Sequence, residues 1–134
     1  MKKCLILLGL VSCLPTMMSC RRTTASLPPT AQIEFLSEVS YDYSDVGADD
    51  TVKHWFVYRN TGSVPFIINK VETQCGCTSA RFSKEPLAPG DTDSILITLV
   101  QKGLVSGYLY KNCWIYSNVD SVYRLTMQGM HVIR

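Results

Sequence analysis

Cysteines are the residues whose type and spacing could do chemistry in this sequence. Six occur among 134 residues, and two of them form the tetrapeptide Cys75-Gly76-Cys77-Thr78. Two thiols this close can form a bridge, exchange with another thiol, carry an attached group, or bind a soft metal such as copper(I) or zinc. Two ligands are too few for a metal site, and no helix N-terminus is predicted nearby to stabilise a thiolate. A structural role, as packed thiols or a local bridge, requires nothing further.

Cys113 is the third thiol downstream of Cys20. Three thiols allow three single bridges among Cys75, Cys77 and Cys113, and each bridge leaves one thiol over. A bridge between Cys75 and Cys77 would need Cα atoms near the upper end of the tolerated separation, so we expect it to be strained and easily reduced. Cys113 alternates with Ile115 on the predicted inward face of a strand, where it can also be a small buried hydrophobe.

Other soft ligands do not complete a metal site. Met127 and Met130 would face opposite sides of a strand, and His54 is predicted to be a half-buried histidine on an inward face rather than a ligand. His131 is the only other histidine. The acidic stretch 42–50 offers too few oxygen ligands in register for a calcium loop. No metal and no cofactor are predicted.

Catalytic motifs are also missing from the sequence. It contains no Gly-x-Ser-x-Gly elbow, no phosphate-binding glycine loop and no His-Glu-x-x-His. Pairs of acidic residues fall at predicted turns, where Asp is favoured because it hydrogen-bonds the backbone. No catalytic residue is predicted, and we do not expect an enzyme.

The N-terminus predicts export and lipidation. Lys2 and Lys3 precede a largely apolar run, 4–14, which is about half the length needed to cross a membrane. Together with the small-residue exit that follows, this predicts a signal peptide over 1–19. Met17-Met18-Ser19-Cys20 resembles the lipobox of bacterial lipoproteins, which implies cleavage before Cys20 and acylation of its thiol. Two or three acyl chains would anchor the protein durably to a membrane.

A short tether is predicted between the lipid and the folded domain. Residues 20–31 contain a Pro pair and no hydrophobic period, and the folded domain is predicted over 32–134. The tether has no acidic residue, whereas surface-exposed lipoproteins of some gut-type bacteria carry acidic export signals just after the cysteine. We therefore expect a cell-envelope location on the periplasmic face of the outer membrane.

Seven strands are predicted for the folded domain. Short alternating runs of β-branched and aromatic residues recur every 8 to 12 residues, and no window has the period of a crossover helix. This pattern predicts an all-β, seven-stranded antiparallel sandwich. The predicted strands cover 33–39, 51–59, 65–72, 78–82, 93–101, 108–116 and 122–132.

The charge balance argues against nucleic-acid binding. The chain has 13 basic and 11 acidic residues, and Lys2 and Lys3 account for the excess, so 11 of each sign remain from Cys20 onward. A neutral domain lacks the positive footprint that phosphate backbones require.

Three predicted strand starts carry an Asp, a hydroxyl residue and an aliphatic residue in succession. The hydroxyl residues are Thr51, Ser94 and Ser121. The pattern resembles the O-glycosylation sequon of Bacteroidetes, and it is equally typical of ordinary strand entry from a polar turn.

Three segments in order resemble a known bacterial family. They are Asn60-Thr-Gly-Ser-Val-Pro-Phe-Ile-Ile68, Cys75-Gly-Cys-Thr78 and Leu87-Ala-Pro-Gly90. Their order is similar to that of domain-of-unknown-function family 1573, and the resemblance covers about 35–132. It implies an immunoglobulin-like β-sandwich, often on an envelope lipoprotein of Bacteroidetes-type bacteria, and it implies no reaction. From the residues alone, Asn60-Thr-Gly62 is interpreted as a hairpin turn and Pro89-Gly90 as a type II turn.

Two functional hypotheses follow. The first is a non-enzymatic, lipid-anchored interaction or structural module of the envelope, with a protein partner held by exposed strand edges or by Trp55 and Trp114. The alternative is a thiol-dependent redox or soft-metal-handling protein that uses Cys75-Gly76-Cys77.

Overall fold

The computed structural model describes residues 28–44 and 51–132, and these residues form strands and no helix. The predicted signal peptide, Cys20 and the tether up to residue 27 lie outside the described residues. No helix in the described ranges has the length and hydropathy to span a membrane. The strands are β1 (Ile33–Phe35), β2 (Ser40–Asp42), β3 (Thr51–Asn60), β4 (Ile68–Thr73), β5 (Thr78–Arg81), β6 (Thr92–Val100), β7 (Gly107–Ser117) and β8 (Tyr123–His131).

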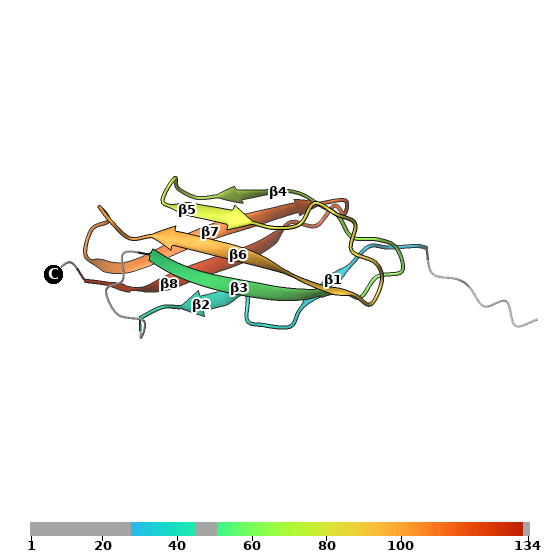
Figure 1. Cartoon of the computed structure of the whole chain (residues 1–134), viewed down its shortest axis with the longest axis horizontal. Coiled ribbons are helices and arrows are strands. Elements are labelled where there is room, and N and C mark those ends of the chain that lie inside the picture. Colours follow the sequence, from blue (N-terminus) through green and yellow to red (C-terminus); the bar gives the residue numbers. More distant parts are fainter. Residues whose placement is uncertain (1–27, 45–50, 133–134) are drawn as a thin grey trace, which may run out of the picture.

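These strands form two four-stranded sheets that lie face to face, as in a sandwich (Figure 1). The first, called the β3–β6 sheet here, has the order β1-β3-β6-β5 and lies in front in Figure 1. The second, called the β7–β8 sheet, has the order β2-β8-β7-β4 and lies behind it. The described chain begins at one end of the sandwich, and the connection between β4 and β5 lies at the opposite end.

Alternation of residue types decides which side chains fill the space between the sheets. In β3, Val52, Phe56 and Tyr58 are buried, and Trp55 between them points outward. Because successive side chains of a strand point to opposite faces, a two-residue apolar period yields one inward face. The other buried apolar residues with at most 2% exposure are Tyr43, Phe66, Ile68, Ile95, Ile97, Leu99, Cys113, Ile115, Leu125 and Met127.

The seven-strand count was wrong because the first predicted run, 33–39, is two strands. β1 pairs with β3, the chain then crosses to the other sheet, and β2 pairs with β8. The crossing is held at both ends by main-chain hydrogen bonds, Leu36 N to Val57 O and Thr126 N to Val39 O. Because β3 and β8 each have a free edge on this side of the sandwich, one short run can add an edge strand to both sheets. β2 runs parallel to β8, so the pairing is not antiparallel throughout.

The two predicted turns had different outcomes. Gly90 has φ 86° and Asp91 N donates to Ala88 O, which confirms a type II turn at Pro89-Gly90. The interpretation of Asn60-Thr-Gly62 as a hairpin was wrong, because β3 and β4 belong to different sheets. Glycine is required at position 62 by close approach, since an added Cβ would lie 2.3 Å from Thr30 O.

Candidate functional site

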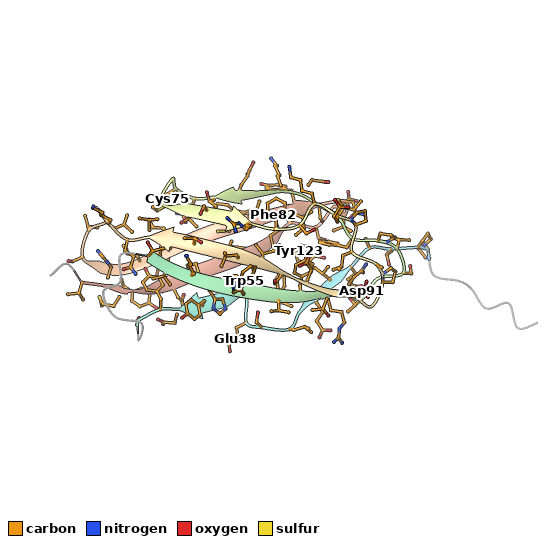
Figure 2. The ribbon with its side chains drawn as sticks, in the orientation of Figure 1. Glu38, Trp55, Cys75, Phe82, Asp91 and Tyr123 are labelled. Carbon is orange, nitrogen blue, oxygen red and sulfur yellow. A yellow bond between two sulfur atoms is a disulfide. The ribbon has the colours of Figure 1, made fainter. Side chains whose placement is uncertain are left out.

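Cys75 and Cys77 lie in the turn that connects β4 to β5 and so joins the two sheets. The structure bonds them in a disulfide with Cα atoms 5.2 Å apart. This separation lies within the common range for disulfides, not near its upper end as expected. Both cysteines are half-buried, and Gly76 between them is exposed. Figure 2 places Cys75 at the end of the sandwich opposite to the first described residues.

Thr78, the last residue of the motif, ties the disulfide turn to the domain. Its hydroxyl lies 3.5 Å from the Cys75 sulfur and 3.8 Å from the Cys77 sulfur, and the residue is buried. Its main-chain N–H donates to Cys75 O at 3.2 Å, while Val100 N–H donates to Cys77 O at 2.8 Å. Cys75, Cys77 and Thr78 therefore each have a structural contact that accounts for their type.

Cys113 is a free thiol in the core of the β7–β8 sheet, on the same inward face as Ile115. Burial raises its pKa to about 11 because the apolar surroundings disfavour the thiolate. The thiolate is the reactive form of cysteine, so the Cys113 thiol is unreactive at neutral pH.

Alkylation of the native protein tests this distribution of thiols. At pH 8 only about one Cys113 thiol in a thousand would be ionised, and the thiolate accumulates as the pH approaches 11. We expect no iodoacetamide adduct on Cys75, Cys77 or Cys113 in the native protein, two after reduction, and three after reduction in urea. Intact mass measures each number. One adduct on the native, unreduced protein would contradict this assignment.

Candidate metal ligands do not converge among the described residues. No group of three His, Cys, Asp or Glu side chains in 28–44 and 51–132 could hold a metal ion. The His54 ring stacks on Tyr41 at 3.9 Å between centroids and meets Phe56 edge-on, and burial lowers its pKa. His131 Nδ1 lies 2.5 Å from Gln101 Oε1 in the core. The packing of both rings is thus explained by protein contacts.

The two methionines near the C-terminus and the acidic residue Asp42 do not come together in a site. Met127 is buried and Met130 is exposed, so the two face opposite sides as predicted. Asp42 accepts hydrogen bonds from Ser44 N–H and the Tyr108 hydroxyl, which lower its pKa, with the bonds to Ser44 contributing most. The remainder of the acidic loop, 45–50, lies outside the described residues.

The three hydroxyl residues of the glycosylation pattern are not equivalent. Thr51 is the exposed first residue of β3, and Ser121 is exposed just before β8. Ser94 is the third residue of β6 and is half-buried, so it lies inside a strand rather than at its entry. Two of the three positions are therefore open to modification.

The outward face of the β3–β6 sheet has an apolar centre. Trp55 is 52% exposed and pairs across the strands with Leu96, which in turn pairs with Arg81 of β5. Figure 2 shows Trp55 midway along the sheet. We call Trp55, Val57 and Leu96, with Lys53 and Arg81 beside them, the Trp55 face. An exposed aromatic with cations on the same sheet face is typical of a surface that contacts an apolar and acidic partner.

Sequence reasoning missed a row of aromatic residues on the outward face of the other sheet. Tyr108, Tyr110, Trp114 and Tyr116 occupy alternate positions of β7, interrupted by Asn112. The spacing of two was visible in the sequence, but it was used only to place Cys113 and Ile115 inward. Trp114, predicted to face away from those two residues, is half-buried on this outward face.

The first and third family-like segments meet around Asn60. The Asn60 side chain is fully buried, and its Nδ2 donates to Val64 O at 2.9 Å and to Leu87 O at 2.8 Å. Its Oδ1 accepts from Gly62 N at 2.9 Å, and its main-chain oxygen accepts from Gly90 N at 2.8 Å. Segments that are separated in the sequence are therefore held together by one side chain.

A family model described as "protein of unknown function (DUF1573)" matches residues 33–131, which include all three segments. The chain belongs to the DUF1573 family. The match ends at β8 and begins at β1, so the DUF1573 unit is the complete sandwich. No curated protein matches the sequence.

Solved structures share the fold of this DUF1573 domain. A protein of unknown function from Porphyromonas gingivalis W83 has a TM-score of 0.66 at 17% identity, covering 81% of this chain and 51% of its own. The secreted serine protease VesC from Vibrio cholerae has a TM-score of 0.53 at 11% identity, covering 74% and 23%. The VesB protease from Vibrio cholerae has a TM-score of 0.52 at 12% identity, covering 77% and 32%.

This DUF1573 chain spans about half the length of the Porphyromonas protein and less of the two proteases. At these identities the likeness shows the fold alone, because sandwiches of this kind carry many unrelated functions.

Proposed function

We propose that this protein is a non-enzymatic cell-envelope lipoprotein whose immunoglobulin-like β-sandwich is a protein-interaction module. The observation that supports this most directly is the Trp55 face. A tryptophan that is half exposed in the middle of a sheet keeps apolar surface in water, and covering it with a partner recovers that free energy. Buried Trp residues are also the side chains most often responsible for binding energy at protein interfaces.

Charges beside Trp55 indicate the chemistry of the partner. Lys53 and Arg59 lie on the same outward face of β3, and Arg81 lies on β5. None of the three forms a salt bridge with another described residue. An acidic protein surface with an apolar centre would complement this arrangement.

The proposed anchor is Cys20, on the periplasmic face of the outer membrane. Support comes from the lipobox-like sequence Met17–Cys20 and from the short span between Cys20 and Pro28, where the described chain begins. A short tether keeps the end of the sandwich near β1 close to the membrane and directs the disulfide turn away from it (Figure 1). Intact mass of protein extracted from membranes is expected to begin at Cys20 and to include acyl chains. In a Cys20→Ser variant the protein should leave the membrane fraction, and a variant that stays membrane-bound would contradict the anchor.

Site-specific crosslinking tests the interaction surface. A photo-crosslinking residue at position 55 is expected to give one discrete adduct in intact cells, whereas one at the exposed Val105 should give none. A crosslinker at position 57 should report the same adduct, and Trp55→Ala should reduce it about tenfold. Equal adducts from positions 57 and 105, or no effect of Trp55→Ala, would contradict a role for this face.

The alternative is a thiol-dependent function, and the half-buried disulfide in an exposed turn is the observation that favours it. The double variant Cys75→Ser/Cys77→Ser separates the two hypotheses. The interaction module predicts an unchanged crosslink from position 57 and at most a change in stability. Loss of that crosslink in a folded double variant would favour the thiol-dependent function.

A further inference from the structure

The outward face of the β7–β8 sheet carries two aromatic side chains that keep surface open to a ligand, Tyr110 and Trp114. The Tyr110 ring meets Tyr108 edge-on at 5.1 Å between centroids, and the rest of its surface remains exposed. Tyr108 is held by a hydrogen bond to Asp42, and the Tyr116 ring is covered by Lys70 Nζ at 4.4 Å from its centroid. Tyr110 is 58% exposed, and Trp114 is half-buried on the same side of the strand. Trp114 lies four positions after Tyr110, which is about 13 Å along a strand and suits an extended ligand of several units.

An open depression of about 520 Å³ lies beside Tyr110, between β2, β8 and β7. The polar residues and the ring that line it are Ser40, Tyr110, Asn112, Arg124, Thr126 and Gln128. Asn112 is fixed by hydrogen bonds from Thr126 Oγ1 to its Oδ1 and from its own Nδ2 to Gln74 Oε1. The depression is therefore a mostly polar surface in which the Asn112 amide, on the β7 side, is held in a fixed orientation.

Several donors in this depression are not used within the described part of the chain. The side chains of Ser40, Arg124 and Gln128 make no hydrogen bond to another described residue. Arg124 also lacks a carboxylate partner there, because Glu72, on the far side of Trp114, is bonded to Lys70 at 2.6 Å. A guanidinium left unpaired in this way is complementary to one carboxylate of a ligand.

We propose that this face binds the glycan strand of the cell wall, a chain of N-acetylated amino sugars in which every second sugar carries a carboxylate-bearing substituent. Tyr110 and Trp114 supply flat apolar surfaces on which sugar rings stack. Gln128, Ser40 and the fixed Asn112 amide pair with hydroxyl and acetamido groups, and Arg124 binds a carboxylate.

The same observations disfavour a protein on this face. The core of a protein interface is more apolar than the rest of the surface, whereas most residues that line this depression are polar, Asn112, Thr126 and Gln128 among them. They also disfavour a polyuronate, in which every sugar is charged, because the depression has one cation, Arg124, beside Trp114, and Tyr110 pairs with the neutral Gln128. The chemistry of the ligand is inferred from the residues of this face. Only the choice of the cell wall as the source of the glycan rests on the proposed envelope location.

Calorimetric titration of the full-length protein tests the proposal with three soluble glycans of equal length. The first is a cell-wall glycan strand freed of its stem peptides, so that every second sugar has a free carboxylate. The second is a chitin oligosaccharide without carboxylates, and the third is an oligogalacturonate with one on every sugar. We expect the cell-wall glycan to bind about tenfold more tightly than chitin oligosaccharide, the effect of one charged hydrogen-bonded pair. Oligogalacturonate should bind no better than chitin oligosaccharide.

Variants assign the two parts of the site. Tyr110→Ala should lower the affinity for both amino-sugar glycans about tenfold, because it removes a ring on which the sugars of either glycan would stack. Arg124→Gln should lower only the affinity for the cell-wall glycan, which should then bind no more tightly than chitin oligosaccharide. Trp55→Ala, on the opposite sheet, is the matched control and should change neither Kd. Because Tyr110 and Arg124 are exposed, an unchanged urea midpoint shows that both variants remain folded.

Several results would overturn the proposal. The first is that neither amino-sugar glycan shows saturable binding. The second is that Tyr110→Ala and Arg124→Gln leave the affinities unchanged. The third is that a stem peptide alone binds as tightly as the glycan, which would make this a peptide site. None of them bears on the anchor, because the titration needs no membrane, whereas the Cys20→Ser fractionation tests the location separately.

Discussion

Replacing Asn60 by alanine is expected to lower the free energy of unfolding by about 3 kcal/mol, because it removes three hydrogen bonds of a buried amide at once. The side chain is fully buried and makes three hydrogen bonds, with Val64 O, Leu87 O and Gly62 N. Alanine removes all three bonds: Val64 O then has no other hydrogen-bond partner among the described residues, while Leu87 O keeps the bond from Phe66 N and Gly62 N keeps its bond to Gln32 O. Each lost hydrogen bond costs about 1 kcal/mol, and the carbonyl left without a partner adds to that cost if it stays shielded from water.

Urea denaturation of the purified protein measures this loss. Asn118→Ala is an informative comparison, because Asn118 also bonds two main-chain groups, Ile67 N and Pro65 O, but lies exposed. Water can replace it, so we expect a loss of about 1 kcal/mol or less. Asn69→Ala is the control, since Asn69 is exposed and makes no side-chain hydrogen bond to another described residue. A loss at Asn60 no greater than at Asn118 would show that Asn60 does not hold the segments together.

Replacing Gly62 by alanine is expected to cost about 2–3 kcal/mol and to loosen the start of the folded domain. An added Cβ would lie 2.3 Å from Thr30 O and 2.6 Å from Gln32 N, and both are main-chain atoms that cannot rotate away. The segment 30–32 must therefore move. It is held by hydrogen bonds from Thr61 N and Gly62 N to Gln32 O and from Ser63 N to Thr30 O, which would be strained or lost.

Limited proteolysis and urea denaturation together measure this effect. In Gly62→Ala we expect cleavage near 30–32 at protease concentrations that leave the parent protein intact. Gly76→Ala is the matched control, because nothing lies within 4 Å of its added Cβ and its φ is not positive. Its stability should change by less than about 0.5 kcal/mol. Equal behaviour of the two variants would show that residues 30–32 are not packed against Gly62.

Local patterns predicted much of the fold, because side-chain alternation is a property of the strand itself. The inward positions of Cys113 and Ile115 were predicted from the two-residue period and are confirmed by their burial. The type II turn at Pro89-Gly90 was predicted because glycine tolerates positive φ without help from the rest of the chain.

The disulfide turn was only partly predictable. The spacing of Cys75 and Cys77 permitted a bridge, but the sequence left three pairings open. The structure bonds Cys75 to Cys77, while Cys113 is on the inward face of β7 and takes no part. Thr73 and Cys113 are neighbours across β4 and β7, so strand register places Cys113 beside the end of β4 and its inward orientation commits it to the core. Register between strands comes from the packed sheet.

By itself the sequence determined the class of this protein: an all-β domain with alternating faces, membership of a family recognised through three ordered segments, and the prediction of an exported, lipidated N-terminus. These depend on residue types and short spacings. Only the tertiary structure decided that 33–39 divides between two sheets, that β2 runs parallel to β8, and that Asn60 joins Val64 to Leu87. The physical reason is that main-chain donors and acceptors are the same in every residue, so which ones pair is settled when the two sheets pack.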